Sequence, residues 1–258
     1  MYFFRRLIVL PAAVGFAATA AFAFSASNVV ITPTEFDFGW CPDNAKISAQ
    51  FTIKNTGSDL IPITSVQPTC GCTASQFTPA TLGSNEESNV GLTFNTRGYA
   101  KSSFSKSTKI KTDAGGAEYS VLLKGSVLDA QAKVVPDQDG VAGFEPGSKG
   151  KKKTIQIQNK GDKDVTLQIV QAPASWATAK IKTTTVGAGA SVPIEISVDS
   201  PLDEAKDTSV TIEAKSETET SRLTIAIRTG PPPPPTKRAS TAVPVPAPAP
   251  TPAKSKEK

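Results

Sequence analysis

The feature that most constrains the fold is a period-two alternation of apolar and polar residues. In the clearest run, apolar side chains occupy every second position, namely Ile47, Ala49, Phe51 and Ile53. Such alternation is typical of a β-strand with one buried and one exposed face. A pairing error of one residue would turn the buried face outward, so the pattern also fixes the register of each strand.

The alternating pattern occurs twice along the chain, as an internal repeat. A shift of 104 residues, the distance from Asn55 to Asn159, places Asn55-Thr56-Gly57 on Asn159-Lys160-Gly161 and superposes the apolar positions of both halves. Chance overlap of two alternating patterns does not explain the shared turns. Short strands separated by turn signals, repeated in this way, predict an all-β protein. We expect two tandem immunoglobulin-like β-sandwiches, at 28–130 and 131–230.

The first 23 residues are predicted to be a cleavable signal peptide. Arg5 and Arg6 precede an alanine-rich apolar run, and Ala21-Phe22-Ala23 fits the small-x-small cleavage rule. We expect the mature chain to start near Phe24 and to keep no stable membrane anchor. An uncleaved membrane anchor is the alternative.

Residues 231–258 are predicted to form a disordered, proline-rich tail. Five consecutive prolines are followed by a run that alternates proline with valine and alanine, and proline cannot donate the hydrogen bonds of a sheet. Most of the net charge of +5 lies in this tail and in the signal. Because the middle is close to neutral, we expect no nucleic-acid partner.

The chain contains no histidine. This excludes Ser-His-Asp and Cys-His catalysis and histidine-bearing zinc sites. No glycine-rich phosphate loop follows a strand and opens a helix. We therefore expect no enzymatic activity and no cofactor. The basic run Lys149–Lys153 is interpreted as a solvated loop, with contact to anionic polymers or lipid headgroups as the alternative.

The three cysteines are the candidate site residues. Phe36 to Phe38 alternates, Gly39 permits a turn, and Cys41 follows in the expected loop, while Cys70 and Cys72 follow the next strand but one. Antiparallel connectivity places all three thiols at one pole of the first sandwich.

Three roles for these thiols stay open: a structural or unpaired role, a disulfide of Cys41 with Cys70 or Cys72 that leaves one free thiol, and a soft-metal site for Cu(I) or Zn(II). Cys-x-Cys is a weak metal signal, so no metal ligand is assigned. The second repeat has Ala174 and Trp176 at the positions of Cys70 and Cys72, so the fold itself does not require the thiols.

The first half resembles a bacterial family of domains of unknown function, number 1573. The resemblance covers about Asn28 to Val127, and these motifs carry it: Phe36-Asp37-Phe38-Gly39, Phe51 to Gly57, Cys70-Gly71-Cys72-Thr73 and Leu92 to Thr96. It implies an exported immunoglobulin-like module related to ASH/MSP-type sandwiches, in the periplasm or at the cell surface, with no established activity. Cys41 is not part of the family pattern.

These observations together predict a non-enzymatic, exported binding or scaffolding protein of the cell envelope. Related sandwiches bind protein partners by adding a strand to an exposed sheet edge. The alternative is a periplasmic thiol-redox or soft-metal handling protein that uses Cys41, Cys70 and Cys72. The sequence does not identify the partner.

Overall fold

The computed structural model describes residues 28–69, 73–78, 80–113, 116–147, 149–199 and 204–231. All regular elements in these ranges are β-strands, and none of the described residues belongs to a helix that could cross a membrane. The all-β class predicted from the alternation is confirmed. The predicted signal peptide, Cys70, Cys72 and the tail beyond Pro231 lie outside the described residues.

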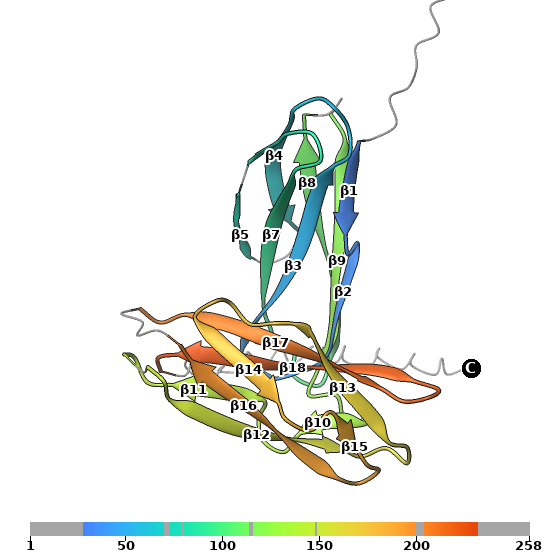
Figure 1. Cartoon of the computed structure of the whole chain (residues 1–258), viewed down its shortest axis with the longest axis vertical. Coiled ribbons are helices and arrows are strands. Elements are labelled where there is room, and N and C mark those ends of the chain that lie inside the picture. Colours follow the sequence, from blue (N-terminus) through green and yellow to red (C-terminus); the bar gives the residue numbers. More distant parts are fainter. Residues whose placement is uncertain are drawn as a thin grey trace, which may run out of the picture.

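The first sandwich packs two sheets face to face (Figure 1). One sheet has the order β1 (Val29–Thr32), β3 (Lys46–Asn55), β7 (Glu87–Asn95) and β5 (Thr73–Thr78). The other has the order β2 (Glu35–Cys41), β9 (Glu118–Val127), β8 (Ser103–Thr112), β4 (Ile61–Pro68) and β6 (Thr81–Leu82).

The second sandwich repeats this plan. One sheet has the order β10 (Val134–Pro136), β12 (Lys152–Asn159), β16 (Ser191–Val198) and β14 (Ala177–Ile181). The other has the order β15 (Thr185–Val186), β13 (Val165–Gln171), β17 (Asp207–Lys215) and β18 (Thr220–Thr229), with β11 (Val141–Phe144) parallel to β18.

The alternating residues form the two cores, as the pattern predicts. On β3, the four inward residues Ile47, Ala49, Phe51 and Ile53 are all 0% exposed. On β16, the inward residues are Val192, Ile194, Ile196 and Val198, and all are buried. Burying one such side chain contributes about 1.5–3 kcal/mol, so each strand is held mainly by its inward face.

Each Asn-x-Gly turn closes one end of its sandwich. The Asn55 side chain is fully buried, donates to the carbonyls of Asp59 and Leu82, and accepts from the Gly57 N–H. Asn159 makes the equivalent hydrogen bonds in the second sandwich, to Lys163, Val186 and Gly161. The shared turn chemistry is therefore a buried amide that satisfies several backbone groups at once.

One ten-stranded sheet runs through both sandwiches, which the sequence does not predict. Strand β2 of the first sandwich lies parallel to β18 of the second and pairs with it at Trp40 and Leu223. In Figure 1 the first sandwich stands with its lower end on β17 and β18. The two repeats are thus joined through strands that lie far apart in the sequence.

Candidate functional site

The junction between the sandwiches is organised around Gly39. Its φ is +62°, and an ideal Cβ at this position would lie 1.9 Å from the backbone oxygen of Arg222. Only glycine allows this approach without strain. The adjacent Phe38 carbonyl accepts a hydrogen bond of 2.7 Å from the Thr224 hydroxyl. Gly39 therefore brings the backbone of β2 against the backbone of β18.

The turn predicted at Gly39 is a β-bulge instead. The β2–β9 register shifts between Asp37 and Trp40, and β2 continues to Cys41. The Asp37 carboxylate accepts a 2.8 Å hydrogen bond from the Gly39 N–H and holds the extra residue in place. A bulge re-aims the side chains that follow it. Here it reverses the alternation set by Phe36 and Phe38, so that Cys41 points into the first core and Trp40 into the second.

Trp40 and Ala226 are each buried in the core of the sandwich to which they do not belong. Trp40 belongs to β2, yet its side chain is buried in the core cluster of the second sandwich. Ala226 belongs to β18 and is buried in the core cluster of the first sandwich. Each sandwich is therefore completed by a residue of the other, which opposes independent motion of the two.

Side chains of the second sandwich also cap an open edge of β3. Strand β1 pairs only with Thr52 to Asn55 of β3. Beyond β1, the Ser48 N–H donates to Ser209 at 2.9 Å and the Gln50 N–H donates to the Gln171 side chain at 3.0 Å. The Gln171 amide in turn donates to the Ser48 carbonyl. This part of β3 is consequently closed to an incoming strand.

Of the three candidate cysteines, the structure describes Cys41 alone. The bulge turns its side chain into the first core, where it is 0% exposed, and its thiol donates to the Gly39 carbonyl at 3.4 Å. An ideal Cβ on Gly125 would lie 3.1 Å from the sulfur, so β9 closes over the thiol. Cys41 is a free cysteine. Cys70 and Cys72 lie outside the described residues, so the predicted disulfide of Cys41 with one of them stays a prediction.

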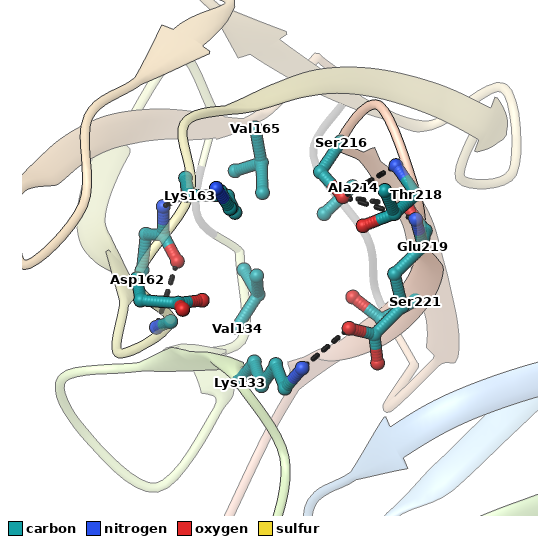
Figure 2. Close-up of a pocket in the computed structure, with 12 residues that line it drawn as sticks. Lys133, Val134, Asp162, Lys163, Val165, Ala214, Ser216, Thr218, Glu219 and Ser221 are labelled. Atoms are coloured by element: carbon teal, nitrogen blue, oxygen red, sulfur yellow. Dashed lines mark hydrogen bonds and ion pairs between the residues drawn. The ribbon is translucent and has the colours of Figure 1, made fainter.

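A cavity of about 260 Å³ lies beside the Asn159 turn of the second sandwich (Figure 2). Its apolar lining residues are Val134, Val165 and Ala214, and a 2.5 Å ion pair joins Lys133 to Glu219 across it. At the equivalent positions of the first sandwich, the Asn28 side chain packs onto Gly57, and the fully buried Ile110 stands in place of Ala214. The second repeat thus has a smaller side chain, Ala214, in the lining of its cavity.

The lining of this cavity mixes charges of both signs. Asp162 and Glu219 supply carboxylates, while Lys133 and Lys163 supply ammonium groups. Sequence reasoning does not find this cavity, since its residues come from three separate turns. Among the described residues there is no group of three or more His, Cys, Asp or Glu side chains that could hold a metal ion.

Comparison with protein families identifies both halves of the chain. Residues 29–127 match the family described as "Protein of unknown function (DUF1573)". The first sandwich is a DUF1573 domain. Residues 144–228 match the HYDIN/CFA65/VesB-like, Ig-like domain, which confirms the immunoglobulin-like class for the second sandwich. No curated protein matches the chain.

Several solved structures are similar to the DUF1573 domain and its neighbour at low identity. A protein of unknown function from Porphyromonas gingivalis W83 is 16% identical, with 79% of this chain and 100% of that chain covered and a TM-score of 0.33. The ASH/PapD-like domain 7 of human CEP192 is 15% identical, with 38% and 84% covered and a TM-score of 0.31. The periplasmic chaperone SfaE is 13% identical, with 78% and 98% covered and a TM-score of 0.29.

Burial makes the Cys41 thiol of the DUF1573 domain chemically inert. The pKa of the thiol is raised well above the usual range, mainly by desolvation and to a smaller extent by repulsion from Asp37. A hydrogen bond from the Ser126 backbone lowers the pKa in part. The thiolate is the form that attacks disulfides and binds metals. Cys41 is thus a poor nucleophile and a poor ligand, and it lends no support to thiol or metal chemistry.

We expect stability to fall at alkaline pH because of Cys41. The folded pKa of this thiol is raised, so its stabilising effect is complete below the unfolded pKa of about 8.5 and is lost as pH rises above it. Denaturant unfolding of wild type and Cys41→Ala, compared at pH 7 and pH 10, should show about 2 kcal/mol more loss for wild type. Equal losses would contradict the burial of the thiol.

Proposed function

We propose that this protein is a non-enzymatic, exported binding or scaffolding protein of the cell envelope, acting as one rigid two-sandwich unit. The immunoglobulin-like and DUF1573 domains supply the architecture. The observation that carries the proposal is the junction, in which Trp40 and Ala226 complete each other's cores.

Rigidity of this kind suits a scaffold. Interfaces between domains of one chain are usually small and polar, so the domains usually move against each other. Here the interface includes a continuous sheet, the glycine contact at Gly39 and the capped edge of β3. Binding surfaces on the two sandwiches therefore keep a fixed spacing, which favours simultaneous contact with an extended partner.

Cross-linking of the full-length protein in its native cells tests this proposal. We expect fractionation to place the protein in the envelope, and mass spectrometry to identify a defined cross-linked protein partner there. A matched control is an unrelated exported immunoglobulin-like sandwich expressed at the same level. Recovery of the same species with both proteins, or of none with this one, would contradict the proposal.

A further inference from the structure

We infer that β14 of the second sandwich binds an extended segment of a partner protein, in which apolar and acidic residues alternate. The inference rests on the proposed binding function and names the surface and the chemistry of the partner. Three observations support it: the other sheet edges are protected, backbone N–H and C=O groups of β14 point away from the sheet, and lysine side chains lie beside this edge.

The other edge strands carry features that oppose strand addition. Register shifts interrupt β4, β5 and β13. Strands β6 and β15 have two residues each, and β10 ends in Pro136. Strands β1 and β11 have four residues each, and each is followed within two residues by a proline, Pro33 and Pro146. Bulges, prolines and short length are the usual means by which proteins protect exposed edges.

Strand β14 carries none of these features. Its five residues, Ala177–Ile181, pair with β16 in one unbroken register and include no proline. Among the described strands it pairs with β16 alone, so its opposite side is an edge of the sheet. It is the equivalent of β5 in the first repeat, where a register shift interrupts the pairing.

Hydrogen bonding to β16 shows which backbone groups of β14 face outward. Asp199 donates to the Trp176 carbonyl at 2.9 Å, and these residues are opposite each other in the register of this pair. Hydrogen-bonded and non-hydrogen-bonded pairs alternate in an antiparallel ladder. Thr178 and Lys180 therefore face β16, whereas the N–H and C=O groups of Ala179 and Ile181 face the open edge.

The outer face beside this edge is positively charged. Lys180 lies opposite Glu195, and Lys152 forms an ion pair with that carboxylate at 2.9 Å. The hydrogen bond from Lys152, and then the charges of Lys152, Lys182 and Lys180, hold the pKa of Glu195 below its usual value, although partial desolvation acts against them. The second carboxylate at this edge, that of Asp199, accepts hydrogen bonds from the Thr178 and Ser197 hydroxyls. Three ammonium groups therefore stand against two carboxylates, and the excess lies beside Lys180, which favours acidic side chains on the outer face of an added strand there.

The inner face at this edge is apolar. Trp176, Ala179 and Ile181 are half-buried and pack against the second core. An added strand would place every second side chain beside them, because side chains alternate between faces. Apolar residues at those positions would extend the core. The partner segment is therefore expected to alternate apolar and acidic residues.

Binding of a labelled peptide to the full-length protein tests the inference. The probe is acetyl-Thr-Val-Glu-Val-Glu-Val-Glu-Thr-amide, measured by fluorescence anisotropy at low salt and at physiological salt. We expect saturable binding that weakens with salt. The same peptide with lysine in place of glutamate, or with alternate backbone nitrogens methylated, should bind at least about tenfold more weakly. Equal binding of all three peptides would overturn the inference.

Two variants locate the site on the protein. Ala179→Pro removes an outward N–H that takes no part in the β16 ladder, a position where edge strands tolerate proline. It should abolish peptide binding and leave the melting temperature within a few degrees of wild type. Lys180→Glu should reverse the preference between the acidic and basic peptides. Lys160→Glu, on an exposed turn, is the charge-matched control and should change neither.

The outcomes separate this inference from the proposed function. If cross-linking in cells identifies a partner but Ala179→Pro leaves peptide and partner binding unchanged, the role of β14 is overturned and the scaffold proposal stands. If the peptide binds through β14 but cross-linking in cells identifies no partner, the scaffold proposal fails and the inference that β14 binds an extended segment is kept. If the peptide does not bind at all, the inference about β14 is wrong.

Discussion

Replacing Gly39 with valine should destabilise the protein more than any other single substitution at the junction. The new Cβ would lie 1.9 Å from the Arg222 oxygen and 2.3 Å from its carbonyl carbon, so β2 must move away from β18. That movement removes the hydrogen bond from Thr224 to Phe38. A side chain at φ +62° costs roughly a further 1–2 kcal/mol. Chemical denaturation of the full-length protein should show a total loss above about 4 kcal/mol.

Gly98 provides a matched control for this prediction. Its φ is +86°, but no heavy atom lies within 4 Å of an ideal Cβ. Gly98→Val therefore introduces the backbone strain without the collision and should cost about 1–2 kcal/mol. If Gly39→Val and Gly98→Val prove equally destabilising, the close contact between β2 and β18 does not exist in solution.

The regular strands were predictable because the alternation that defines each one lies within a short continuous stretch of the sequence. The inward residues of β3 and β16 follow from the period of two, and the repeat of Asn55 at Asn159 follows from the shift of the whole pattern. The buried role of these two amides was not predicted, although Asn-x-Gly gave the turn itself. Each amide bonds backbone groups of its own turn and of one distant strand end, and the sequence shows only that the residue is an asparagine.

The junction was not predictable for the same reason. Glycine is a typical turn residue, so the sequence indicates a turn at Gly39. In the structure, however, the lack of a Cβ lets Gly39 approach the backbone of Arg222, which lies far along the chain. The bulge at Gly39 then decides where Trp40 and Cys41 point. Without the bulge, the alternation would put Trp40 on the inward face with Phe36 and Phe38 and would turn Cys41 outward. Instead Cys41 enters the first core and Trp40 the second, and the expected loop at Cys41 is a buried strand end. Such non-local contacts have no periodic signature.

Truncating Trp40 should destabilise the second sandwich, although the residue belongs to the first. Its indole is 7% exposed and lies in the second core, where an ideal Cβ on Gly140 would be 2.6 Å from the ring. Removing a buried tryptophan typically costs about 3–5 kcal/mol. Hydrogen exchange of Trp40→Ala should therefore show lost protection in β10 and β18, together with a lower unfolding midpoint.

Trp176 is the natural comparison, because it has the same side chain and packs half-buried against the same core. Trp176→Ala should cost less, about 1–2 kcal/mol, since less apolar surface is lost from the interior. If Trp40→Ala instead weakens protection only in β3 and β7 of the first sandwich, the indole does not enter the second core. The two sandwiches would then be linked without the Trp40 contact, through the hydrogen bonds of β3 and β18 and the burial of Ala226. The fixed spacing between their binding surfaces would lose its largest apolar support.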